Sequence, residues 1–184
     1  VGYSALAANT TGTRAVAVGY NALGANTTGD RNHALGLGAL ATNTTGNYNT
    51  AVGYSALNSN TTADSNSALG YAALSANTTG ANNVAMGYGA LQVNTTGGAL
   101  TAFGRQALAA NTTANNNAAF GDQALYTNTT GVRNTAVGWQ AATSITTASE
   151  STAIGYAALQ QTTTGAQNTA IGAYSLITNS TGSD

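Results

Sequence analysis

Apolar and polar positions recur along this chain with a period of 17 residues. Written from its first glycine, the unit reads G-Y-x-A-L-x-x-N-T-T-G-x-x-N-T-A-V. Such a unit is too short for a pair of helices, and its apolar positions lack helical spacing. Val and Thr, with Gly and Asn at regular intervals, are typical of short strands joined by tight turns. Eleven glycines keep the spacing of 17 with no insertion or deletion: Gly2, Gly19, Gly36, Gly53, Gly70, Gly87, Gly104, Gly121, Gly138, Gly155 and Gly172.

Stacked units of this kind predict an all-β fold, a parallel β-solenoid of eleven 17-residue coils. Residues i and i+17 would then lie about 4.8 Å apart, and like residues would form ladders of Asn amides or Tyr rings. The chain has no Pro, which would remove a ladder donor. We therefore expect a single repeat domain over 1–184, a rod about 50 Å long. Both ends fall inside the repeat, which favours an excerpt of a longer fibre.

Two apolar columns are adjacent in the unit: an alanine such as Ala17, and a larger residue such as Val18. Neighbouring side chains of a strand point to opposite faces, so both columns cannot face one interior. We expect the same of the pair Ala22 and Leu23. One set would fill the coil and the other would contact further copies, which predicts a homo-oligomer. The alternative is a monomer in which the alanines face solvent and the larger residues point inward.

Charged side chains are scarce, since 4 Lys+Arg and 5 Asp+Glu make up 5% of the residues, against roughly 25% in ordinary domains. No basic face is available to neutralise phosphates, which excludes nucleic-acid binding. No apolar run approaches the roughly 18 residues of a membrane helix, so we expect no membrane insertion. The absence of Cys excludes disulfides and thiolate metal sites.

One motif of the repeat resembles a known family. N-T-A-V-G occurs at 49–53 and 134–138, and N-T-A-I-G at 168–172. These segments resemble the N-S-x-A-I-G motif of trimeric autotransporter adhesin heads. The longer unit, N-T-A-V-G-Y-x-A-L-x-x-N-T-T-G, is similar to repeats of phage tail-fibre-type proteins. In adhesin heads the repeat is usually shorter, so the N-T-T-G arm is an addition.

This resemblance covers essentially the whole chain. It implies a homotrimer of left-handed parallel β-rolls. It also implies an extracellular, cell-surface or virion location, and a structural role as the shaft or head of an adhesive fibre. A partner of such a fibre would be a host-surface or glycan receptor.

Reactive side chains do not gather in this sequence. The single histidine, His33, lies in a column filled mainly by Thr, Ser and Val, so we interpret it as a ladder substitution. The acidic residues lie in different coils, and no G-G-x-G-x-D calcium repeat is present. We therefore expect no enzyme, no metal and no cofactor.

The charges nevertheless show a pattern. Arg105 and Asp122 share one column in successive coils, and Arg133 and Glu150 share another. We predict that each pair is adjacent in space. As exposed ion pairs they would contribute at most about 1 kcal/mol each.

The column after the glycine is the candidate recognition surface. Exposed rings can stack on sugars, which makes a glycan-binding module one alternative function. The other interpretation is a ladder of rings that stack on each other or cover a seam between copies. Leu37, Arg105, Asp122 and Ala173 interrupt the column. Its aromatic members are Tyr3, Tyr20, Tyr54, Tyr71, Tyr88, Trp139 and Tyr156.

A second alternative function comes from the N-T-T segments. We expect Asn9 and Thr11, and their equivalents in later coils, to point the same way. A flat face of regular Thr and Asn side chains would suit an ice-binding β-solenoid. The competing interpretation is that these groups form inward ladders or cap turns.

The coil over 138–154 departs from the unit. Ala142 replaces Leu, Ile145 replaces Asn, and Trp139 replaces Tyr. We expect a local irregularity there, with the bulk of Trp139 offsetting the small Ala142.

Overall fold

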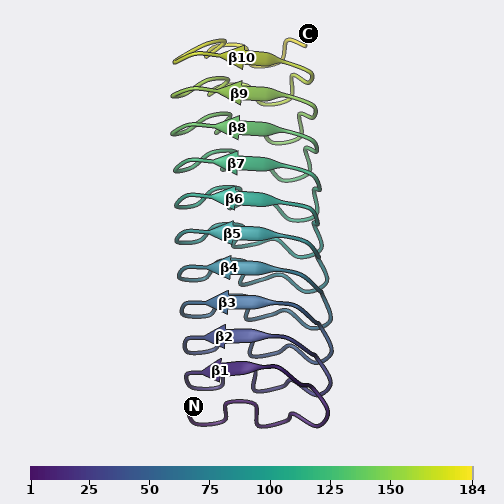
Figure 1. Ribbon diagram of the computed structural model, residues 1–184. Coiled ribbons are helices and arrows are strands. Elements are labelled where there is room, and N and C mark those ends of the chain that lie inside the picture. The colour runs from purple at the N-terminus through teal and green to yellow at the C-terminus, as the bar shows by residue number, and fades with distance from the viewer. Residues whose placement is uncertain (184) are drawn as a thin grey trace.

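The computed structural model describes residues 1–183 as a stack of similar coils that forms a rod, with no helix among those residues (Figure 1). None of the described residues therefore forms a helix that is long and apolar enough to cross a membrane. Each coil contributes one three-residue strand. The strands are β1 (Val16–Val18), β2 (His33–Leu35), β3 (Thr50–Val52), β4 (Ser67–Leu69), β5 (Val84–Met86), β6 (Thr101–Phe103), β7 (Ala118–Phe120), β8 (Thr135–Val137), β9 (Thr152–Ile154) and β10 (Thr169–Ile171).

All ten strands form one parallel sheet in chain order. Every strand pairs with the next at an offset of 17 residues, as in Ala17 opposite Ala34 and Ala34 opposite Ala51. The all-β parallel β-solenoid with 17-residue repeats, of about nine turns, is confirmed. The constant spacing of the glycines is what keeps each column in register.

Each strand buries its central alanine and turns its flanking residues outward. Ala34 is fully buried, whereas Leu35 beside it is 41% exposed. The alanine column therefore fills the coil, and the opposite arrangement, with the larger residues of the strand inside, is wrong. The reason is space: the opposite wall already places leucines such as Leu23 and Leu40 in the same core, so only a small side chain fits.

The predicted opposition of Ala22 and Leu23 is also wrong. Both residues are fully buried in the same core. Leu23 lies outside the strands and has φ of 51°, in the left-handed region. This conformation reverses the side-chain direction expected of a strand, so alternation does not apply to this wall.

The coil turns at three non-glycine residues with positive φ. In one coil these are Asn21, Leu23 and Arg31, with φ of 55°, 51° and 56°. The repeat glycine has a different constraint. Gly70 has φ of 137°, and a Cβ atom there would lie 2.5 Å from the carbonyl oxygen of Gly87 in the next coil. Only glycine combines that backbone conformation with so close an approach.

Two ladders of buried asparagines run along the inside of the stack. In the first, which runs from Asn9 to Asn128, each side chain donates to the asparagine one coil earlier, as Asn43 Nδ2 does to Asn26 Oδ1 at 2.8 Å. In the second, the backbone N–H of Asn49 donates to Oδ1 of Asn32 at 2.9 Å. These bonds satisfy polar groups that would otherwise be costly to bury.

Candidate functional site

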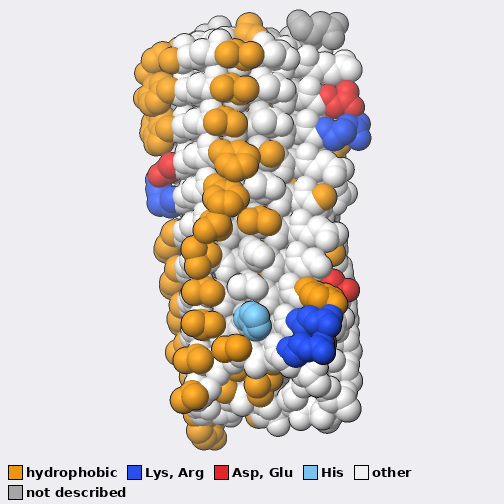
Figure 2. Space-filling view, in the orientation of Figure 1, with side chains coloured by type: hydrophobic (Ala, Val, Ile, Leu, Met, Phe, Trp, Pro, Cys, Tyr) orange, Lys and Arg blue, Asp and Glu red, His pale blue; other side chains and the backbone are white. Residues whose placement is uncertain are grey.

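The outer face of the sheet carries a band of apolar side chains, most of them exposed and three (Val52, Met86 and Phe103) half-buried, which we call the apolar stripe (Figure 2). It exists because the third residue of each strand points away from the alanine core. In Figure 2 it runs along the front of the rod. Its members are Val18, Leu35, Val52, Leu69, Met86, Phe103, Phe120, Val137, Ile154 and Ile171.

A shallow hollow of about 150 Å³ interrupts the apolar stripe. It lies over β3, β4 and β5 and is lined by Thr50, Val52, Ser67, Ala68, Leu69 and Met86. Directly above it in the stack, the rings of Phe103 and Phe120 pack on each other with centroids 5.4 Å apart. Along the rod, the outer face therefore has a low region at the hollow over β3–β5, followed by a raised region at the two phenylalanine rings of β6 and β7.

The aromatic column flanks the apolar stripe, and its rings stack on one another along the rod. Tyr54, Tyr71 and Tyr88 form one stack, with centroids 5.1 Å apart and interplanar angles of 8°. Trp139 and Tyr156 form another, at 5.0 Å and 10°. Since neighbouring rings cover each other's faces, the stacks present mainly ring edges and hydroxyl groups to solvent.

The remaining members of the column are also placed by the stack. Tyr3 and Tyr20 lie 5.6 Å apart with an interplanar angle of 12°. Tyr174 meets Tyr156 edge-on at 4.9 Å, next to Ala173, which carries no ring. Leu37 separates the pair of Tyr3 and Tyr20 from the stack that begins at Tyr54. This geometry matches the interpretation as a ladder of rings and leaves few ring faces for a sugar.

The structure brings together both charged pairs that the sequence analysis singled out. Arg105 binds Asp122 through two bonds of 3.0 Å, from Nε to Oδ2 and from Nη2 to Oδ1. Arg133 donates to Oε1 of Glu150 from Nε at 3.0 Å and from Nη2 at 2.5 Å. Both pairs are exposed, so solvent screens them.

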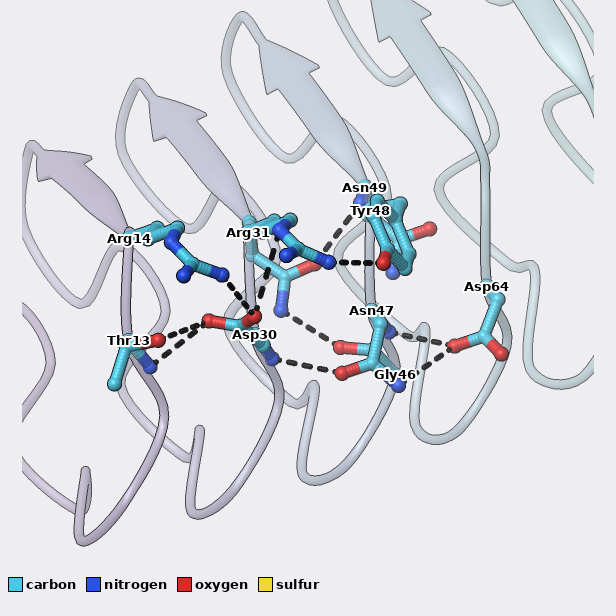
Figure 3. Close-up of polar contacts among 10 residues, drawn as sticks. Thr13, Arg14, Asp30, Arg31, Gly46, Asn47, Tyr48, Asn49 and Asp64 are labelled. Carbon is cyan, nitrogen blue, oxygen red and sulfur yellow. Dashed lines mark hydrogen bonds and ion pairs between the residues drawn. The ribbon is translucent and has the colours of Figure 1, made fainter.

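A polar corner near the start of the rod was not foreseen (Figure 3). Asp30 Oδ1 accepts hydrogen bonds from the Oγ1 and backbone N–H of Thr13, at 2.5 and 3.2 Å. Its Oδ2 lies 3.4 Å from Arg14 and 3.6 Å from Arg31. Arg31 also bonds the hydroxyl of Tyr48 and lies 4.9 Å from its ring centroid. The signal was in the columns, because Thr13 and Asp30 are 17 residues apart.

The carboxylates of these clusters are stabilised in their charged form. The hydrogen bond from Thr13, followed by the charges of Arg31 and Arg14, lowers the pKa of Asp30 below its ordinary value. The hydrogen bond from Arg133, followed by its charge, lowers the pKa of Glu150. Both groups remain acidic anions at neutral pH, and neither has the raised pKa of a general acid.

His33 lies on the outer face of β2, between Val16 and Thr50 on the neighbouring strands. It is exposed and occupies an ordinary position of the sheet. Among residues 1–183, no group of three or more His, Cys, Asp or Glu side chains lies close enough to hold a metal ion.

The predicted common direction of Asn and Thr in the N-T-T segments is wrong. Asn26 is fully buried in the amide ladder, whereas Thr28 is exposed. The turn that closes at Asn26 aims its amide at the carbonyl of Gly29 at 3.0 Å, so the side chain points inward. The exposed hydroxyls therefore form a single row of threonines without the asparagines.

The local irregularity predicted over 138–154 is absent from the backbone. Ala142 keeps its ladder hydrogen bond to Ala158, at 2.8 Å, and the left-handed φ of this column, 52°. Trp139 points outward and is 43% exposed, so it does not offset the lost leucine. Ile145, in the asparagine column, is fully buried in the core with Ala142 and supplies the apolar volume instead.

Comparison with known proteins gives no match to this chain among protein-family models, curated proteins or solved structures.

Proposed function

We propose that this chain is a non-enzymatic structural segment of an extracellular attachment fibre, and that it associates with further copies through the apolar stripe. One observation carries the proposal. A straight stack in unbroken 17-residue register exposes an apolar band along its whole length. A rod suits a spacing or presenting role, and an apolar band along it suits lateral association.

Rigidity of the rod is supported by its hydrogen bonding. The buried amides of the first ladder bond both along the stack and within their own turn, as Asn77 does to Asn60 at 3.0 Å and to Gly80 at 2.9 Å. Each coil is thereby tied to its neighbour by the backbone and by side chains. Over residues 1–183 the stack has no long loop at which a protease would cut.

Association is supported by the amount of exposed apolar surface. Six rings of the aromatic column beside the stripe are each roughly half exposed. At about 200 Å² for a whole ring, they alone expose about 600 Å². With the apolar stripe, the face exceeds the few hundred Å² that monomers ordinarily expose, and it approaches the about 800 Å² per partner of a stable interface.

The resemblance to adhesin heads and tail-fibre-type repeats supports the location and the role. On that basis the proposal includes eleven left-handed coils, an extracellular, cell-surface or virion location, a homo-oligomer, and attachment to a host-surface or glycan receptor. The resemblance implies three copies, and the mass in solution counts them.

The test is the mass of the chain in solution, by analytical ultracentrifugation of the parent, Leu69→Glu and Thr79→Glu. Leu69 lies on the apolar stripe and is 44% exposed. Thr79 is an exposed threonine of the N-T-T row and serves as the matched control. We expect an oligomer for the parent and the control, and a monomer for Leu69→Glu. A monomeric parent, or an unchanged mass for Leu69→Glu, contradicts the proposal.

A further inference from the structure

The apolar stripe is uneven around Met86 in a way that makes the coils on its two sides complementary. Met86 lies between a low region and a raised region, each of two coils. One coil away from it are Leu69 on one side and Phe103 on the other, and two coils away are Val52 and Phe120. The hollow is lined by Val52 and Leu69, and the raised region is the stacked pair of phenylalanines.

We propose that two copies pack sheet against sheet in antiparallel orientation, about a two-fold axis at Met86, in place of the homotrimer that the resemblance implies. The inference rests on the proposed use of the apolar stripe and names the orientation of the partner. The two-fold axis lies in the plane of contact and runs perpendicular to the long axes of the two rods. Each column of one copy therefore faces the same column of the other copy, with its coils in reverse order. Phe103 then faces Leu69 of the second copy, and Phe120 faces its Val52, in the self-complementary pattern of a two-fold interface.

Side-chain volume favours this orientation over a parallel one. Antiparallel pairing opposes large and small residues: Phe120 with Val52, Phe103 with Leu69, and Met86 with itself. Parallel pairing of equal coils opposes phenylalanine with phenylalanine and valine with valine. Two straight rods would then touch at the rings and leave a gap at the hollow. Interfaces pack about as densely as protein interiors. The antiparallel arrangement is therefore preferred, because the summed volume of each facing pair of side chains is similar along the interface.

The aromatic column is complementary under the same axis. Coil reversal brings Leu37, the aliphatic interruption, to the level of Trp139, the largest side chain of the column. It also brings the two charged interruptions to tyrosines: Arg105 to Tyr71 and Asp122 to Tyr54. Both faces of the Tyr71 ring are covered by its neighbours in the stack, so Arg105 would meet its hydroxyl, which can accept a bond from a guanidinium. The carboxylate of Asp122 can accept a bond from the hydroxyl of Tyr54. Parallel pairing would instead set Arg105 at the level of a second Arg105.

The column formed by the first residue of each strand is compatible with the same axis. His33, the largest polar side chain there, comes to the level of Thr135, and Thr50 to that of Ala118. Val84 meets itself beside the axis. All three columns reverse about the same coil, that of Met86, and none of the pairs named sets a charge against a like charge.

Short-range chemical cross-linking tests the orientation, because the chain has no Cys. Leu35 and Val137 lie three coils on either side of Met86 and are both exposed. A bismaleimide that spans about 10 Å bridges thiols on facing sheets. We expect an equimolar mixture of Leu35→Cys and Val137→Cys chains to form a mixed dimer. Leu35→Cys alone should not link, because its two thiols lie about 29 Å apart along the rods.

Each result is informative. Met86→Cys should link to itself and shows that the reagent reaches the interface, while Thr79→Cys, away from the sheet, should not link. Efficient linking of Leu35→Cys to itself means parallel copies, which overturns the inference and leaves the proposed association intact. If neither Met86→Cys nor the mixture of Leu35→Cys and Val137→Cys forms a cross-link, and the chain has a monomeric mass, the proposed function is overturned as well.

A second measurement tests the volume match without a reagent. Val52→Phe fills the hollow, so it should weaken association by about tenfold. The exchange Val52→Phe with Phe120→Val restores one large and one small residue on each side and should recover the parent affinity. Unchanged association of Val52→Phe, or no recovery in the exchange, contradicts the antiparallel arrangement.

Discussion

Asn128 is the last residue of the first amide ladder, and Ile145 stands where the next coil would continue it. Asn128 donates to Asn111 at 3.1 Å and to the carbonyl of Gly131 at 3.0 Å. Its own Oδ1 is buried and accepts no hydrogen bond within residues 1–183. The break leaves one unsatisfied acceptor, which costs about 1–3 kcal/mol.

Restoring the consensus coil should stabilise the rod only when both core positions change together. Ile145→Asn alone supplies a donor to Asn128 but removes apolar volume beside Ala142, so we expect a loss of about 1–2 kcal/mol. Ala142→Leu alone overpacks the site by about 1–3 kcal/mol. The double variant should exceed both and gain about 1 kcal/mol over the parent. Urea unfolding of the four chains measures the coupling, and additive effects would show that the two positions do not share one space.

The amide ladder should contribute far more to stability than the exposed threonines beside it. Asn77→Ala removes two donated hydrogen bonds and takes from Asn94 one of its two acceptors, so the free energy of unfolding should fall by about 2–4 kcal/mol. Thr79→Ala alters an exposed side chain of the same N-T-T segment and should change it by less than about 0.5 kcal/mol. Comparable losses for the two variants would contradict a structural role for the buried amides.

Two glycine columns should respond differently to alanine. Gly70→Ala combines a φ of 137° with a Cβ placed 2.5 Å from a backbone oxygen, so we expect a loss of about 3 kcal/mol or more. A Cβ at Gly80 would also lie close to backbone, 2.2 Å from the carbonyl oxygen of Gly97, but Gly80 lacks the positive φ. Its column already holds Ala63 and Ala114 in other coils, so this corner can shift to accept a Cβ, and Gly80→Ala should cost about 1–2 kcal/mol, less than Gly70→Ala. Thermal unfolding decides this, and a tolerated Gly70→Ala would contradict the account of the 17-residue period.

Acid should weaken the polar corner at Asp30. Its pKa in the folded chain is lowered, so folding favours the deprotonated form. The contribution is complete above the ordinary pKa of the carboxyl and is lost as pH falls through the folded value. Thr13→Val removes the largest cause, so the titration midpoint of Asp30, followed by NMR, should move upward. Thr11→Val, two residues before Thr13 on the exposed row, should leave the midpoint in place. Equal midpoints in all three chains would contradict the assignment.

Register was predictable because it depends on spacing alone. Once Gly53 and Gly70 were aligned, the pairing of Ala51 with Ala68 and of Arg105 with Asp122 followed from counting. Which way a side chain points was predictable only within strands, where alternation is fixed by the pleat.

The two errors in side-chain direction share one physical origin, the non-strand geometry of the turns. Leucine rarely adopts positive φ, so nothing in the composition suggested that Leu23 turns inward beside Ala22. The same non-strand geometry turned Asn26 away from Thr28. The polar corner was missed for another reason: the partner of Asp30 at the full period, Thr13, carries no charge, and the charged Arg14 is 16 residues away, one short of the period.

The left-handed corners also determine how such a chain acquires its shape. Each non-glycine residue in that conformation costs about 1–2 kcal/mol, so a lone coil with three of them is unfavourable by several kcal/mol. Only bonds to adjoining coils offset that energy, and a 17-residue peptide should stay unstructured. Assembly must therefore begin with a nucleus of several coils, after which every finished turn templates the next, and truncation below that nucleus should abolish folding abruptly instead of shortening the rod.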